Sequence, residues 1–397
     1  MKLPSPTLWL PSLLLPLASS LALHKNHPRQ NTDVSQCKLP ADPNTYLSVG
    51  HGLLPGSSPA VGTQTSRMIF IDFPDAPAPA SDTPQSLYDV FMPGAADWYT
   101  TSSYGKLSLD VQADMTRGFV RMPVASTSYN WARGLTAELH YQYIQDALDA
   151  YAAVGGDLSP VDTLYIVPTT AAAAISFTPT YMSSVSPRSG GDAVAGRCVT
   201  VGQDAFIYWF FKVLNHETGH TMGLADLYPL EGGATGTWVG GWDMMCDING
   251  LSPDYFAWDK WRLGWLDDSN FECVAASGSS QHTISAIETL GDGSPIKGVV
   301  VKTSSTEALI AEVRSGQGVD NATCGSGVLL YTISTVIPSG YGSIKVIDTT
   351  PGSGGCGGEE LNDAPLRMDG PTTWQEGNVR VTLLSQDGNT ATIQIDM

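Results

Sequence analysis

A segment with the sequence HETGHTMGLAD constrains this chain more than any other. On a helix, positions i and i+4 lie on one face, so His216 and His220 can reach a single metal ion while Glu217 lies beside it. Gly223 permits the left-handed turn that ends a helix, after which the chain can bring Asp226 to the same ion. Three protein ligands leave the fourth tetrahedral position for water, which is typical of a catalytic zinc site.

The ligand set also predicts the chemistry of the centre. Two neutral imidazoles and one carboxylate leave a zinc ion with a net charge of about +1, and water bound to such an ion has a pKa of roughly 7. Glu217 is expected to accept that proton and to pass it to the leaving amine. Asp226 must be ionised to bind, so metal affinity should fall in acid. If Asp226 is not the ligand, His282 and His140 are the next candidates.

A bare HExxH pattern also occurs by chance on amphipathic helices. Here the preceding run, residues 205–214, is apolar nearly all round, which predicts a buried helix with Asp204 as its N-cap. Burying two histidines and a glutamate on such a helix would be costly without a metal or other polar partners. The context therefore favours a metal site.

Segments on both sides of this helix carry a resemblance to a known family. WDMM at 242–245 and SPDYFAWDKWRLGW at 252–265 follow it, IFIDFPD at 69–75 and SYGKLSLD at 103–110 precede it, and AEVR at 311–314 and GVLLY at 327–331 come later. Together they resemble secreted metallopeptidases of the immune inhibitor A type, from about residue 65 to the end of the chain. The motifs of the metal site are more specific than the flanking ones.

The resemblance implies a zinc-dependent endopeptidase that acts on protein or peptide substrates. It implies an α+β fold class, with a zincin- or metzincin-like catalytic domain and a β-rich C-terminal domain, and it makes Met245 the Met-turn residue beneath the zinc ligands. Many extended HExxH enzymes have a third histidine where this chain has Asp226, a substitution also seen in snapalysin-like peptidases. Carboxylate is an acceptable zinc ligand.

Four sections are expected along the chain. Residues 1–22 have the layout of a signal peptide, with Lys2, a short apolar run and then small residues, which predicts a secreted protein. Residues 23–60 are expected to form an N-terminal arm or a short propeptide. Residues 61–266 should form the catalytic domain, with a helix near 135–151 and a strand at 163–167, and residues 267–397 the β-rich domain, with strands at 298–302, 327–331, 379–383 and 391–395.

Six cysteines in an exported chain predict up to three disulfides, whose pairing the sequence cannot rank. Cys246, directly after the Met-turn residue, is expected to be half of a disulfide rather than a thiolate ligand. Cys37 is likewise expected in a disulfide; the alternative is a free thiol that occupies the zinc and keeps the enzyme latent. Asn321 begins a glycosylation sequon.

Charge and the remaining residues limit the partners. The net charge of −19, without a basic patch, argues against nucleic acid, and no second apolar run could cross a membrane. Tyr228 and Tyr255 are candidate oxyanion donors, although each is more commonly a packing residue. Asp243 is expected to hold the Met-turn. The DING segment at 247–250 is only a weak calcium candidate and reads better as a plain turn.

Two other classes of function remain open from sequence. The chain could be a secreted glycan- or surface-binding protein in which the metal helix is structural, although retention of Glu217 argues against that. Glycoside hydrolysis by paired carboxylates is the second alternative, since acidic residues are plentiful, but nothing in the sequence pairs them.

Overall fold

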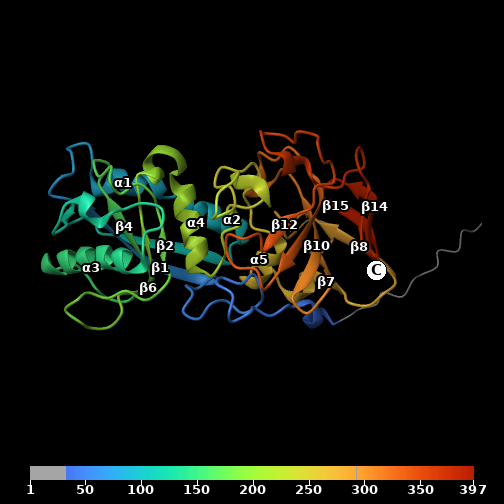
Figure 1. Cartoon of the computed structure of the whole chain (residues 1–397), viewed down its shortest axis with the longest axis horizontal. Helices are drawn as coiled ribbons and strands as arrows, with labels where there is room; N and C mark the ends of the chain where they lie inside the picture. Colours follow the sequence, from blue (N-terminus) through green and yellow to red (C-terminus); the bar gives the residue numbers. More distant parts are fainter. Residues whose placement is uncertain (1–32, 292) are drawn as a thin grey trace, which may run out of the picture.

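A computed structural model describes residues 33–291 and 293–397 (Figure 1). The predicted signal peptide, residues 1–22, and residues 23–32 of the predicted N-terminal arm lie outside the described residues. Helices and sheets are both present, so the fold is of mixed α and β type, as expected. Figure 1 shows the helices gathered in the N-terminal half and the C-terminal half made mainly of strands.

The N-terminal half is built on a six-stranded sheet. Its strand order is β2-β1-β4-β6-β5, with the short β3 paired to β1. Every pairing is parallel except that of β5 with β6, so β5 is an antiparallel edge strand. The strands are β1 (Gly62–Asp72), β2 (Leu107–Ala113), β3 (Val120–Arg121), β4 (Val161–Pro168), β5 (Thr180–Tyr181) and β6 (Ala195–Thr200).

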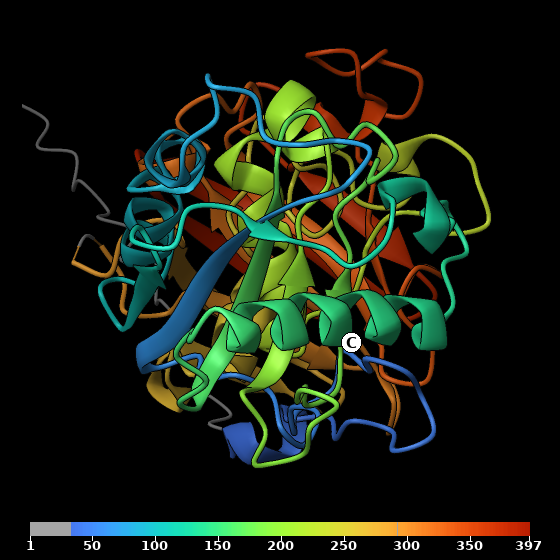
Figure 2. The same ribbon diagram turned by 90° about the vertical axis from the view of Figure 1, so that its left-hand side faces the viewer.

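Alternate side chains of the central strands enter two different cores. Met68 and Phe70 of β1 join the core formed with α2 and α4, whereas Ile69 and Ile71 join the core formed with α3. Because successive side chains of a strand point to opposite faces, this pattern places the sheet between two helical layers. Figure 2 shows α3 crossing in front of the sheet. The helices are α1 (Pro84–Phe91), α2 (Gly94–Ser102), α3 (Ala137–Ala153), α4 (Phe211–Thr221) and α5 (Ala257–Arg262).

Two further sheets form the C-terminal half. A five-stranded sheet has the order β12-β11-β10-β9-β7, and a four-stranded sheet has the order β13-β14-β15-β8. Val299, Leu330 and Ile393 belong to the core between them. The strands are β7 (Phe271–Val274), β8 (Ser279–Ser285), β9 (Gly298–Lys302), β10 (Glu307–Arg314), β11 (Gly327–Ser334), β12 (Ile344–Val346), β13 (Thr373–Glu376), β14 (Val379–Asp387) and β15 (Thr390–Asp396).

The other face of the five-stranded sheet packs on the N-terminal half. Val300, Ile310 and Leu329 belong to the same buried cluster as Met68 and Phe70 of β1. One apolar core therefore runs from the six-stranded sheet to the C-terminal strands. The two halves are held together by the same burial of apolar surface that stabilises each of them.

A buried arginine reinforces this junction. Arg314 of β10 is fully buried and lies 3.3 Å from Glu312 and 3.1 Å from Asp320. Its guanidinium also donates to the backbone carbonyls of Ser252, at 3.0 Å, and Asp254, at 2.9 Å. Breaking a buried charge network costs roughly 3–5 kcal/mol. Arg314 therefore fixes the segment that precedes α5 against the C-terminal sheet.

The described part of the N-terminal arm is packed into the molecule. Cys37 forms a disulfide with Cys273, with their Cα atoms 5.8 Å apart, while Leu39, Leu47 and Val49 are buried in the main core. The disulfide predicted for Cys37 is confirmed, which removes the thiol that the latency alternative needs. A second disulfide joins Cys324 to Cys356.

The disulfide predicted for Cys246 is wrong. Cys246 is a buried free thiol, 3.3 Å from the carbonyl oxygen of Thr235. Cys198 is the other free thiol, and it belongs to the core on the opposite side of the six-stranded sheet. The two sulfurs cannot meet because the sheet lies between them. Each packs as a small apolar side chain.

Most predicted elements are present, and one is wrong. The helix near 135–151 is α3, and the predicted strands correspond to β4, β9, β11, β14 and β15. The run 205–214 is not one buried helix: residues 205–209 form a π-helical turn, and α4 begins at Phe211. Ile207 and Tyr208 are 58% and 62% exposed. Phe210 separates the two helices at a φ of 49°.

Asp204 is consequently not the N-cap of α4, which corrects the sequence-based assignment. Its carboxylate instead accepts hydrogen bonds from the backbone N–H of Thr178, at 3.1 Å, and from the Thr178 hydroxyl, at 2.6 Å. The apolar composition of the run did not reveal that its first part lies at the surface. Asp204 anchors the loop before β5 rather than a helix terminus.

No helix in the described ranges has the length and apolar character that a bilayer crossing requires. The two disulfides are typical of proteins in an extracellular or otherwise oxidising compartment.

Buried histidines predict a loss of stability in acid. Burial lowers the pKa of His140 to about 4, below the ordinary value of roughly 6.5. The unfolded chain therefore binds the extra proton first, so stability is lost as the pH falls from about 6.5 to 4. We expect wild type to lose about 2–3 kcal/mol of unfolding free energy relative to His140→Gln between pH 7 and pH 4. Denaturant titrations at both pH values measure this difference, and equal changes in both proteins would contradict it.

Candidate metal centre

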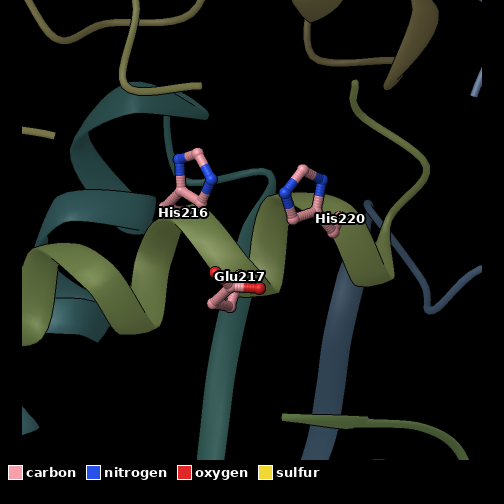
Figure 3. Close-up of side chains that lie close together, drawn as sticks. All are labelled: His216, Glu217 and His220. Carbon is pink, nitrogen blue, oxygen red and sulfur yellow. The ribbon is translucent and has the colours of Figure 1, made fainter. Parts of the chain in front are cut away.

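Helix α4 carries two histidines on one face. His216 and His220 are one turn apart, and their rings project from the same side of the helix with Glu217 on the turn between them (Figure 3). The ring centroids are 4.8 Å apart. One ligand atom from each of the three side chains lies within 4.8 Å of the others, and all three residues are buried. The predicted helical spacing therefore brings these groups together.

Backbone carbonyls orient both imidazoles. The Nδ1 atom of His216 lies 2.9 Å from the carbonyl oxygen of Met244, and that of His220 lies 2.9 Å from the carbonyl oxygen of Leu224. A carbonyl oxygen can only accept, so each Nδ1 must carry the proton. In the neutral rings the Nε2 lone pairs then point toward the space between them. Such outer contacts are typical of histidines that bind metals.

The turn after α4 delivers the third candidate ligand. Gly223 has a φ of 97°, and the Leu224 N–H donates to the carbonyl of Gly219 at 3.1 Å. This is the left-handed glycine turn expected from the sequence. It reverses the chain so that Asp226 Oδ1 lies 3.3 Å from His216 Nε2 and 3.1 Å from His220 Nε2.

A segment of the C-terminal half holds Asp226 in this position. The Asp226 N–H donates to the Ser339 hydroxyl at 2.8 Å, that hydroxyl lies 3.3 Å from Asp226 Oδ2, and the Gly340 N–H donates to the Asp226 carbonyl at 2.9 Å. The carboxylate is therefore fixed from outside the helix. Its inner oxygen remains free to face the two histidines.

The convergence of these atoms favours a cation between them. Asp226 Oδ1 is buried and has no hydrogen-bond donor in the described part of the chain. The two Nε2 lone pairs, each within 3.3 Å of the Asp226 carboxylate oxygen, repel that oxygen unless a proton or a metal ion lies between them. Burial disfavours a charged His220, but the Asp226 carboxylate outweighs it and raises the His220 pKa to about 9. The cluster thus attracts positive charge, and its donor atoms suit a divalent metal ion.

Glu217 is held by a residue that sequence reasoning missed. The Thr180 hydroxyl, on the edge strand β5, donates to Glu217 Oε2 at 2.6 Å. Burial raises the pKa of the Glu217 carboxyl, while His220 and His216 act in the opposite direction. A carboxyl with a raised pKa next to a metal site is suited to accept and return a proton.

The predicted Met-turn residue lies under the helix. A Cβ added to Gly219 would lie 2.7 Å from the Met245 sulfur and 2.8 Å from the Tyr255 hydroxyl, so only glycine fits at this point of α4. Asp243 accepts hydrogen bonds from the N–H groups of Met245, at 2.7 Å, and Phe256, at 2.9 Å. Asp243 therefore holds this turn, as expected.

The two candidate oxyanion donors lie in different places. Tyr255 is fully buried beneath α4, and its hydroxyl lies 3.2 Å from that of Tyr99, which corrects the expectation that it could reach a substrate. Tyr228 lines the cleft in front of Glu217, with its ring centroid 6.0 Å from that of His216. Burial and the carboxylates of Asp226 and Glu217 raise the Tyr228 pKa, so its hydroxyl stays protonated.

Three adjoining cavities form a cleft over these residues. The two inner cavities, of 170 and 160 Å³, both include Glu217 in their walls, and an outer cavity of 710 Å³ extends along β5. Arg133 and Tyr228 line all three. Tyr46 of the N-terminal arm lines two of them and is a further phenol beside the centre.

The remaining sequence candidates lie elsewhere or outside the site. His282 contacts Glu272 in the C-terminal half, and His140 lines the outer cavity but contacts Thr200, so neither is brought together with His216 and His220. The Asp247 side chain accepts from the N–H of Asn249 at 3.0 Å, which is a turn contact. Asn321 is exposed at the end of a short 3-10 helix.

Comparison with models of known protein families gives no match, and no curated protein matches the sequence significantly.

The three converging side chains predict tight binding of one zinc ion. We expect Asp226→Ala to weaken zinc binding more than about 100-fold and Ser339→Ala to weaken it about 10-fold, since outer contacts of ligands contribute roughly 10–100-fold. Competition with a fluorescent chelator measures both affinities. Cys198→Ala, at a buried thiol on the opposite side of the six-stranded sheet, serves as the control and should leave the affinity unchanged. Equal affinity of Asp226→Ala and wild type would show that Asp226 is not a ligand.

Proposed function

We propose that this protein is a secreted zinc-dependent endopeptidase. The observations that carry the proposal are the approach of Asp226 Oδ1 to the Nε2 atoms of His216 and His220, at 3.3 and 3.1 Å, and the Glu217 carboxyl within 4.8 Å of both imidazoles in a cleft. A purely structural metal site has no use for a buried acid that does not belong to the ligand set. The WDMM and LGW segments add the resemblance to immune inhibitor A-type metallopeptidases.

The spacing of the ligand atoms supports zinc. Atoms about 2.0–2.1 Å from a tetrahedral ion lie roughly 3.3–3.4 Å from one another. The distances from Asp226 Oδ1 to the two Nε2 atoms, 3.3 and 3.1 Å, agree with that edge length. Imidazole nitrogens also favour zinc over magnesium or calcium, which prefer oxygen ligands. When bound, zinc supplies a Lewis acid and a water of lowered pKa.

Three side chains of the protein would supply proton transfer, orientation of the base and stabilisation of the oxyanion. Glu217 accepts a proton from the attacking water and returns it to the nitrogen of the leaving group. Thr180 keeps the Glu217 carboxylate in one orientation through the 2.6 Å hydrogen bond. Tyr228, protonated and in the wall of the cleft, can donate to the oxygen that becomes negative during attack.

The edge strand supports a peptide as substrate. β5 is the last strand on its side of the sheet, and Pro179, Thr180 and Met182 line both the outer cavity and an inner one. An extended peptide can pair with an open edge through backbone hydrogen bonds. A peptide paired with β5 would pass beside Glu217, because Thr180 belongs to this strand and its hydroxyl contacts the Glu217 carboxylate.

Secretion is supported by the N-terminal layout of residues 1–22 and by the two disulfides. A glycan-binding role for the C-terminal half has less support. Tyr331 is fully buried and Trp374 packs against the core between the C-terminal sheets, which leaves Tyr341, 45% exposed, as the one large exposed aromatic side chain among the described residues of this half. Glycan sites usually need aromatic rings that are free to stack on sugars.

Substitution of the proposed base separates metal binding from catalysis. Glu217→Gln fills the same space but cannot accept a proton, so we expect it to retain one zinc per chain and to lose about 10²–10⁴-fold in kcat/KM on casein. Metal analysis and a casein assay with and without chelator give both values. Wild-type turnover in the zinc-loaded variant would rule out the proposed mechanism.

The Thr180 hydroxyl offers a second, milder test. Thr180→Val keeps the shape but removes the donor, so we expect kcat to fall about 10-fold with little change in KM, since a charged hydrogen bond contributes roughly 1.5–3 kcal/mol. Thr180→Ser should restore most of kcat. An equal loss in both variants would indicate that the methyl group, and not the hydrogen bond, matters.

A further inference from the structure

Arg133 is the one basic side chain, histidine apart, among the described residues that line the cleft. It lies in the loop before α3 and lines the outer cavity and both inner ones. A single fixed positive charge therefore faces whatever occupies the space beside Glu217.

Other exposed arginines of this half are paired with acids. Arg121 contacts Asp72 at 2.6 Å, and Arg188 contacts Asp146 at 2.6 Å and Asp149 at 3.0 Å. Arg133 forms no such ion pair with any carboxylate in the described ranges. Asp204, one of the acids in the wall of an inner cavity, accepts a hydrogen bond from the Thr178 hydroxyl at 2.6 Å and forms no ion pair with Arg133. The guanidinium of Arg133 is thus available to a ligand.

The structure holds this guanidinium in place without neutralising it. Its central carbon lies 5.0 Å from the centroid of the Phe177 ring, which stabilises a cation through the electrons of the ring. A guanidinium ordered in this way loses less conformational entropy when it binds a carboxylate through two N–H groups.

We propose that Arg133 is a specificity-determining residue that binds a carboxylate of the substrate, so that the enzyme prefers peptides with an acidic group at one position near the scissile bond. This inference rests on the proposed peptidase function. The carboxylate can belong to an Asp or Glu side chain or to the C-terminus of the peptide. Because the protein carries a net charge of −19, highly acidic peptides are repelled at long range, and the preference concerns one local carboxylate.

The test compares matched peptides that differ in a single charge. Peptides with blocked ends carry one Glu, Gln or Lys at each of three positions on either side of the scissile bond, and a further pair differs only in a free or amidated C-terminus. For wild type we expect kcat/KM to be about 5–10-fold higher for Glu than for Gln at one position, or for the free over the amidated C-terminus, as for a partly exposed charged hydrogen bond.

Variants assign that preference to Arg133. In Arg133→Gln, kcat/KM for the Glu peptide should be within about twofold of that for the Gln peptide, and likewise for the free and amidated C-termini. Arg133→Glu should cleave the Lys peptide best. Arg380→Gln is the matched control, since Arg380 is an exposed arginine on β14 that contacts Gln375 and lies far from the cleft. If Arg133→Gln lowers activity equally on Glu and Gln peptides, Arg133 acts on the reaction and not on specificity, and the inference fails.

Binding to an inactive variant separates this inference from the proposed function. Calorimetry with Glu217→Gln should show the same 5–10-fold preference for the Glu peptide, and Glu217→Gln combined with Arg133→Gln should not. If wild type cleaves no peptide but this Arg133-dependent preference is found, the peptidase proposal falls and the carboxylate site stands. Absence of any preference in both binding and cleavage overturns the inference.

Discussion

The mutual repulsion of three ligand atoms is the constraint on which the centre depends. Asp226 Oδ1 lies 3.3 Å from His216 Nε2 and 3.1 Å from His220 Nε2, and each of the three side chains is held on its other side by a backbone carbonyl or a hydroxyl. The atoms cannot move apart without breaking those contacts. The fold therefore holds electron-rich atoms close together, an arrangement that a cation between them would stabilise.

The outer contacts come from parts of the chain that are distant in sequence. Met244 orients His216, Leu224 orients His220, and Ser339 orients Asp226. Ser339 also receives the backbone of the N-terminal arm, because its N–H donates to the Tyr46 carbonyl at 3.1 Å. Arg314 ties the loop after Met244 to β10. The C-terminal sheets are thus part of the support of the centre, which explains why one apolar core spans both halves.

The residues of the centre that follow a local sequence pattern could be predicted, whereas those placed by contacts between distant segments could not. The positions of His216, Glu217 and His220 follow from helical geometry, and that of Asp226 follows from the glycine turn at Gly223, so sequence spacing is enough to place them. Thr180 and Ser339 are single hydroxyl residues with no motif around them. Their partners are 37 and 113 residues away, and only the assembled sheets bring them together.

The same distinction explains the two main errors. The apolar composition of residues 205–214 predicts burial, but composition cannot distinguish an interior helix from a turn at the surface. Cys246 was assigned to a disulfide because secreted proteins usually pair their thiols, yet pairing needs a partner in the same core, and Cys198 lies across the sheet. The missing information was nonlocal in both cases: whether the run lies at the surface, and on which side of the six-stranded sheet each cysteine lies.

Thr180 shows how the edge strand and the centre are linked. Its hydroxyl contacts Glu217, and its backbone belongs to β5, which has an open edge along the cleft. Any shift of β5 would therefore move the hydrogen bond of the proposed base. On the proposed function, a peptide that pairs with β5 is positioned by the same strand that orients Glu217. The scissile bond and the proposed base are then fixed relative to each other. A two-residue strand suffices for this because the Asp204 carboxylate and Thr178 anchor the loop that leads into it.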